Sequence, residues 1–77
     1  MLPSETIKMY GWIQGEVGST EKGFCIVGAM DYASNNNLSY TDMRDAVVAV
    51  HKDFVSWNNK PGRTKQEVID LLVSVGL

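Results

Sequence analysis

The sequence predicts a single, mainly α domain over residues 1–77, with about four short helices and a glycine-rich loop or small hairpin after the first. Three observations lead to this fold class. Apolar residues recur at helical spacing, capping residues precede several of these stretches, and 77 residues leave no room for a second domain. Because so short a chain buries only about 60% of its unfolded surface, its stability must come from good helix packing or from self-association.

The first helix is expected to have Ser4 as its N-cap and Glu5 in its first turn, and to end at Gly15. The segment from Gly15 to Gly23 contains three glycines, which predicts a loop or short hairpin. This segment does not match the phosphate-loop pattern, which requires a Lys followed directly by Ser or Thr after its second glycine.

Residues 24–30 form an apolar run that periodicity alone cannot assign to a buried strand or a buried helix. Its length and the continuation through residues 29–33 favour a helix. Apolar side chains would point nearly all round the axis of this helix, so it belongs in the middle of the domain. The asparagines at 35–37 are predicted to end it in a loop, because asparagine tolerates left-handed backbone.

A third helix is predicted to open with Thr41 as N-cap and Asp42 in its first turn. Its buried stripe has the spacing i, i+4, i+7 and i+11, which is that of one continuous helix. The stripe consists of Met43, Val47, Val50 and Phe54. Residues 57–63 are then predicted to form a turn, with Pro61-Gly62 as its strongest marker.

The last helix is predicted to begin with a capping box. The Thr64 side chain accepts a hydrogen bond from the Glu67 amide, and the Glu67 carboxylate reaches back to the Thr64 amide. Ile69 and Val73 widen the inward apolar stripe of this helix to about half its circumference. The helix is therefore either wedged between two neighbours or half-exposed to a second subunit, which would give a homo-oligomer.

Composition narrows the classes of function. A net charge of −2 argues against general nucleic-acid binding, although residues 52–65 carry a local excess of three positive charges. Cys25 and His51 are the only residues of their types, so no disulfide, zinc site or cofactor is expected. Residues 1–20 contain no long apolar run, so no signal peptide or membrane span is expected. The single thiol fits a reducing cytoplasm.

No group of residues in the sequence indicates catalysis. Cys25 lies in the most apolar segment, where a thiol usually acts as a small hydrophobic side chain. His51 is more typical of a residue at the edge of a core, and Asp42 and Asp45 suit the start of a helix. We therefore expect a protein that is not an enzyme.

The candidate binding residues surround two tryptophans and one turn. Each tryptophan either anchors the core through a hydrogen-bonded indole or lies at an interface. The turn before the last helix could take an anion through Arg63, or it could be a plain capping turn whose amides Thr64 and Glu67 already satisfy. The candidates are Trp12, Trp57, Asn58, Lys60, Arg63 and Thr64.

Several motifs occur in one order along residues 11–68. They are Gly11-Trp12-x-x-Gly15, Cys25-x-x-Gly28-Ala29, Trp57-Asn58 and Gly62-Arg63-Thr64-x-x-Glu67-Val68. Together they resemble an uncharacterised family of small proteins found in bacteria, notably actinobacteria, and in their phages. Phe24 stands where that family tends to have Trp, and Asn59 where it tends to have Asp. The resemblance implies a helical fold and a bacterial or phage setting, but no chemistry.

These observations lead to two main hypotheses. The first is a non-enzymatic, phage-encoded protein that binds a host protein, for example a defence component, and inhibits or redirects it. The alternative is a small-ligand binder that sequesters a nucleotide signal through Lys60, Arg63 and a tryptophan. A structural domain that self-associates through its last helix is a third possibility.

Overall fold

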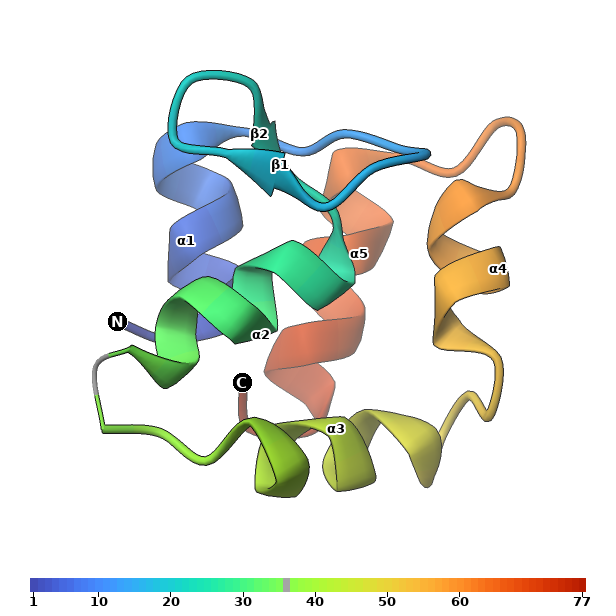
Figure 1. Cartoon of the computed structure of the whole chain (residues 1–77). Helices are drawn as coiled ribbons and strands as arrows, with labels where there is room; N and C mark the ends of the chain where they lie inside the picture. Colours follow the sequence, from blue (N-terminus) through green and yellow to red (C-terminus); the bar gives the residue numbers. More distant parts are fainter. Residues whose placement is uncertain (36) are drawn as a thin grey trace.

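A computed structural model describes residues 1–35 and 37–77 of the chain. Within these residues the chain forms five helices and one antiparallel two-stranded hairpin (Figure 1). The elements are α1 (Pro3–Tyr10), β1 (Gly18–Ser19), β2 (Gly23–Phe24), α2 (Ile26–Ser34), α3 (Tyr40–Val48), α4 (Phe54–Asn59) and α5 (Lys65–Ser74). The mainly α class is confirmed, and the hairpin lies where the glycines predicted it.

Helix α2 lies in the middle of the domain, as its apolar sequence predicted. It packs against α1, α3 and α4, while α1 also packs against α5 (Figure 1). Buried side chains from all five helices meet in one core, which lets a short chain bury enough apolar surface to fold. The largest of them include Ile7, Ile26, Met30, Val47, Phe54, Val68 and Leu72.

Helix α1 begins and ends earlier than predicted. Leu2 rather than Ser4 is the N-cap, and Pro3 takes the first helical position, where its missing N–H costs nothing. The helix ends at Gly11, which has a φ of 100°. At this position the Phe24 N–H donates to the Gly11 carbonyl at 3.0 Å. Trp12 therefore lies in an extended segment bridged to β2 rather than on the helix.

Ser4 is buried inside α1 and joins the two ends of the described chain. Its Oγ and its backbone N–H both donate to the Leu77 carbonyl, at 2.8 and 3.0 Å. The first and last helices are thus fixed to each other by hydrogen bonds as well as by apolar packing.

The prediction of one long third helix is wrong. Helix α3 begins with Ser39, not Thr41, as N-cap and ends at Val48, so that Val50 is exposed instead of buried. A new helix, α4, starts after Asp53, whose side chain accepts from the Ser56 N–H at 3.2 Å. By bonding to a backbone N–H three residues later, the Asp53 side chain starts a new helix. This local bond competes with continuation of α3, which explains the break between α3 and α4.

Helix α4 also occupies part of the predicted turn at residues 57–63. Trp57, Asn58 and Asn59 are helical, and only residues 60–63 turn, with Gly62 at a φ of 86°. At the other predicted loop, Asn35 follows the end of α2 and Asn37 has a φ of 71°. Asn36, which belongs to the same prediction, lies outside the described residues.

The capping box at the start of α5 is confirmed. The Glu67 N–H donates to Thr64 Oγ1 at 3.2 Å, and the Thr64 N–H donates to Glu67 Oε1 at 3.0 Å. Ile69 is buried together with the predicted stripe, and Val73 is exposed. The apolar surface that α5 could offer to a second subunit is therefore smaller than its sequence suggested.

Candidate functional site

The Asn58 side chain is the centre of a buried polar network. It is 1% exposed, and its Oδ1 accepts from the Trp12 indole N–H at 2.8 Å and from the Ile26 N–H at 3.1 Å. Its Nδ2 donates to the Ile13 carbonyl and to Asn59 Oδ1. An amide can make four such bonds, so Asn58 has no free position. Trp12 and Asn58 are thus joined to each other inside the domain.

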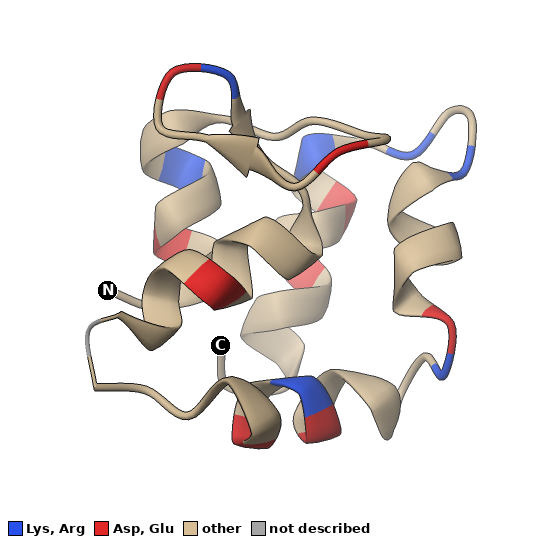
Figure 2. Cartoon of the chain, in the orientation of Figure 1, with Lys and Arg blue, Asp and Glu red and all other residues tan. Residues whose placement is uncertain are grey.

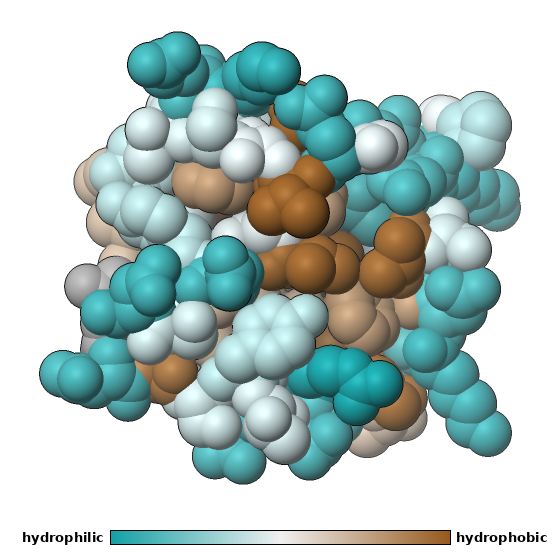
Figure 3. All heavy atoms as spheres, in the orientation of Figure 1, coloured by the Kyte–Doolittle hydropathy of each residue, from teal (hydrophilic) through white to brown (hydrophobic). Residues whose placement is uncertain are grey.

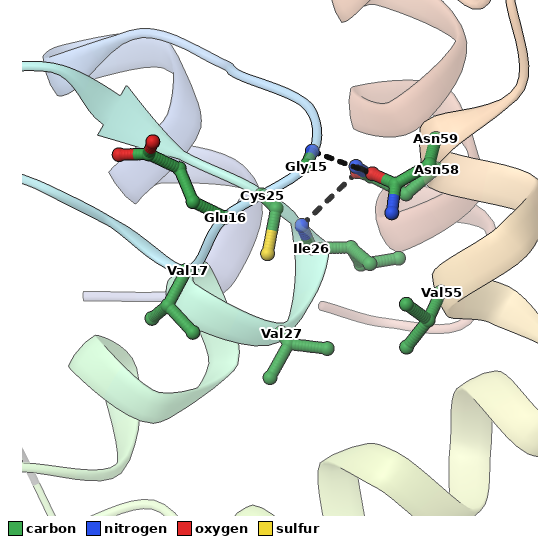
Figure 4. Close-up of a pocket in the computed structure, with 9 residues that line it drawn as sticks. All are labelled: Gly15, Glu16, Val17, Cys25, Ile26, Val27, Val55, Asn58 and Asn59. Carbon is green, nitrogen blue, oxygen red and sulfur yellow. Dashed lines mark hydrogen bonds between the residues drawn. The ribbon is translucent and has the colours of Figure 1, made fainter.

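Two neighbours extend this network, which we call the asparagine clasp (Gln14, Asn58 and Asn59). Gln14 Nε2 donates to the Asn58 and Lys60 carbonyls, both at 2.9 Å. The Gly15 N–H donates to Asn59 Oδ1 at 3.0 Å, a bond drawn in Figure 4 together with that from Ile26 to Asn58. The clasp therefore holds α4 against residues 12–15 and the start of α2.

Trp57 and Arg63 form a second cluster. The Arg63 guanidinium carbon lies 4.1 Å from the centre of the Trp57 ring, and the His51 ring stacks on Trp57 at 5.2 Å. Arg63 also donates from Nε to the Trp57 carbonyl and from Nη1 to Glu67 Oε2. Its side chain is only 12% exposed. Internal contacts thus occupy much of the guanidinium that was one candidate for binding an anion, as expected for a plain capping turn.

The other two predicted residues lie beside this cluster. The Thr64 hydroxyl is part of the capping box, where it contacts both the amide and the carboxylate of Glu67. Lys60 is exposed at the end of α4. The structure therefore brings Trp57, Arg63 and Thr64 together, and joins Trp12 by a hydrogen bond to Asn58 of the clasp.

The Glu67 carboxylate makes the stability of this cluster dependent on pH. The Thr64 amide and hydroxyl donate to it, and Arg63 pairs with it, so its pKa lies below the usual value. Because its pKa is lowered in the folded state, the Glu67 carboxylate stabilises the fold at pH values above the pKa that glutamate has in the unfolded chain. This contribution is lost as the pH falls through the folded-state value.

Glu67→Gln is expected to lower the melting temperature at pH 7, because the amide lacks the charge that Arg63 and the Thr64 amide favour. The difference from the wild type should shrink as the pH is lowered from 7 to 3, as thermal unfolding followed by circular dichroism would show. Glu21→Gln, at an exposed glutamate of the hairpin turn, is the control. A Glu67→Gln deficit that stays constant with pH would contradict this explanation.

A surface hollow of about 310 Å³ lies beside the asparagine clasp, between residues 15–17, the start of α2 and α4 (Figure 4). Its apolar lining comes from Val17, Cys25, Ile26, Val27 and Val55. Its polar lining comes from Gly15, Glu16, Asn58 and Asn59. Of the six predicted site residues, only Asn58 contributes to it.

Three valines from three different segments make the hollow apolar. Val17 is 53% exposed and Val55 is 46% exposed, while Val27 is partly buried. The Cys25 sulfur lies among the lining residues and accepts from the Gly28 N–H at 3.4 Å, so Cys25 acts as the N-cap of α2. Strongly apolar side chains also gather in the middle of this face in Figure 3. Covering such a surface is favourable, because apolar area is removed from water.

A close backbone contact fixes the position of Val17. The Cys25 N–H donates to the Val17 carbonyl at 3.2 Å, and a Cβ on Gly28 would lie 2.0 Å from the same oxygen. Gly28 thus leaves the space in which the segment before β1 crosses α2. The Cys-x-x-Gly spacing therefore has a structural reason. Cys25 bonds to the Val17 carbonyl and Gly28 makes room for it, which fixes Val17 as one wall of the hollow.

Among the residues that the structure describes, Glu16 is the only charged one in the lining of the hollow. Its carboxylate pairs with Lys22 Nζ at 3.3 Å, and both side chains are more than half exposed. In residues 1–35 and 37–77, no three His, Cys, Asp or Glu side chains form a group that could hold a metal ion. The lining therefore offers apolar contact with one carboxylate at its rim.

The fold and this hollow define a small, mainly α domain with an apolar depression on one face. The chain belongs to the DUF6197 family, a family of unknown function that matches residues 4–75. No curated protein and no solved structure matches the chain. In the part of the chain that the structure describes, no helix has the length and apolar character needed to cross a membrane.

Proposed function

We propose that this protein is a non-enzymatic binding domain whose hollow receives an apolar side chain of a partner protein. The observation that carries this proposal is the convergence of Val17, Val27 and Val55 on one open depression. Interfaces obtain most of their binding energy from a few apolar anchors that fill such depressions. The clasp supports this role because it holds α4, which carries Val55, against the rest of the wall.

We further propose a bacterial cytoplasmic setting, with the chain encoded by a phage and its partner by the host. The ordered motifs that resemble bacterial and phage proteins motivate this setting. Binding would block or redirect the host protein, and a defence component is a suitable target for so small a domain. Self-association through α5 has less support, since Ile69 is buried and Val73 is its large exposed hydrophobic residue.

The alternative function, sequestration of a nucleotide signal, would use Lys60, Arg63 and Trp57. It has less support than the hollow. The Arg63 guanidinium already contacts the Trp57 ring, the Trp57 carbonyl and Glu67. A ligand phosphate would have to replace the Glu67 carboxylate there, and a base would have to displace His51 or Arg63 from Trp57. Thermal-shift measurements with cyclic and linear nucleotides test this alternative directly.

Val55→Asp is expected to weaken partner binding on the order of tenfold or more, because it places a charge in the apolar wall. The partner would first be captured from bacterial lysate with the tagged wild type and identified by mass spectrometry. Its dissociation constant would then be measured by calorimetry for the wild type and for the variant.

Val73→Asp is the matched control, because Val73 is also a helical valine, is 56% exposed, and does not line the hollow. This variant should bind the partner like the wild type. Equal loss of binding in the two variants, or unchanged binding by Val55→Asp, would exclude the hollow as the binding site.

A further inference from the structure

We infer that the hollow selects a partner segment in which an apolar side chain stands next to a lysine or arginine. This inference rests on the proposed function and specifies the chemistry of the partner. It follows from the charges at the rim, the weakness of the ion pair there, and the size of the depression.

The charges near the hollow favour a cation. Glu16 provides the one charge in the lining, and Asp31 is exposed on α2 one helical turn after Val27, on the same face of the helix. Figure 2 shows acidic positions both in the segment before β1 and on α2. The lining contributed by residues 1–35 and 37–77 contains no lysine or arginine. A positively charged partner is therefore attracted to this rim, whereas an acidic one is repelled.

The partner of Glu16 within the chain is easily replaced. Lys22 reaches Glu16 from the hairpin turn, and the 3.3 Å pair lies in solvent with both side chains more than half exposed. Exposed pairs of this kind contribute little net stability. Figure 4 shows the Glu16 side chain directed away from Val55, so a cation would meet it at the rim while the adjacent apolar side chain enters the depression.

The size of the hollow favours a side chain as its occupant. A volume of about 310 Å³ is at the lower end of ligand pockets, which run from roughly 300 to 1,000 Å³. The depression has room for one large aliphatic or aromatic side chain, and the neighbouring residue of the same segment must remain outside it. That neighbouring residue would meet the Glu16 carboxylate at the rim.

The test uses three blocked dipeptides, acetyl-leucyl-arginine amide and its glutamine and glutamate analogues. Each is titrated into the ¹⁵N-labelled full chain, and amide chemical shifts are followed by NMR. We expect the arginine peptide to shift the amides of residues 15–17 and 25–27. Its affinity should exceed that of the glutamine peptide by about two- to fivefold, and the glutamate peptide should bind most weakly.

Two variants separate the role of the carboxylate from that of the ion pair. Glu16→Gln should lower affinity for the arginine peptide by about two- to fivefold and leave the glutamine peptide unchanged. Lys22→Met should raise affinity for the arginine peptide, because it frees the carboxylate. Glu21→Gln, at the exposed glutamate of the same hairpin, should change neither.

Opposite effects of Glu16→Gln and Lys22→Met support the inference. If both variants weaken binding equally, the pair only shapes the loop and the inference is overturned. Equal affinity for all three peptides also overturns the inference, while leaving the proposed apolar binding intact. If none of the peptides shifts residues 15–17 or 25–27, both this inference and the proposed use of the hollow fail.

Discussion

Replacement of Asn58 with leucine is expected to lower the free energy of unfolding by about 3–5 kcal/mol. Leucine has a similar size but accepts and donates no hydrogen bond. It would leave the Trp12 indole N–H, the Ile26 N–H and the Ile13 carbonyl without their present partner. Each buried polar group left unpaired costs roughly 1–3 kcal/mol, so the loss of several at one position is large.

Urea unfolding followed by tryptophan fluorescence measures this effect, and Trp12 reports on the clasp directly. Asn58→Asp keeps the acceptor for Trp12 and Ile26 and should cost less than Asn58→Leu. Asn35→Leu, at an exposed asparagine after α2, should change stability by less than about 0.5 kcal/mol. A loss below about 1 kcal/mol for Asn58→Leu would show that the network contributes little to the fold.

Gly28→Ala is expected to destabilise the protein by about 2–3 kcal/mol, although the same change inside an ordinary helix is stabilising. The helical backbone at Gly28 accepts alanine, but the added Cβ would lie 2.0 Å from the Val17 carbonyl oxygen. Either Val17 or α2 must then move. Because Val17 forms a wall of the hollow, the variant should also weaken binding of the partner.

Gly62→Ala is the control that separates a steric clash from backbone strain. Gly62 has a φ of 86°, and a Cβ there would meet nothing within 4 Å. Its cost should be about 1 kcal/mol, from the left-handed backbone alone. Thermal and urea unfolding of both variants provide the comparison. A Gly28→Ala protein as stable as the wild type would show that Val17 moves away freely.

The sequence predicted those elements whose signals are local. Thr64 and Glu67 specify the start of α5 through four consecutive residues, and the structure contains both expected bonds. The apolar run in α2 predicted its central position for the same reason, since a helix apolar on all sides must be surrounded. The glycines around the hairpin likewise indicated a change of direction that the backbone requires at Gly18 and Gly23.

The errors occurred where two signals competed. Met43, Val47, Val50 and Phe54 fit one helical stripe, yet Asp53 caps a new helix and interrupts it. Helical spacing alone does not show where a capping side chain will end one helix and start another. Similarly, Ser39 and Thr41 are both good N-caps, and their sequence neighbours do not distinguish them.

Most of the candidate site could not be predicted from the sequence, because its residues are far apart in the chain. Trp12 and Asn58 are 46 residues apart, and their bond depends on how α4 packs beside the extended segment after α1. Val17, Val27 and Val55 come from a loop and two helices, so no periodicity connects them. The isolated exposed valines in a loop and a short helix were the only signal, and single exposed valines are common on protein surfaces.

The contact between the two ends of the chain has a consequence for how the protein folds. The bond from Ser4 to Leu77 joins residues 73 positions apart, and α1 packs against α5 as well as against α2. Closing so long a loop is entropically costly and slows folding relative to contacts between neighbouring helices. During synthesis, α1, α2 and α3 can pack together as they emerge, whereas the contacts between α1 and α5 must wait for the last helix. The final step of folding is therefore expected to be the docking of α5 between α1 and the rest of the core.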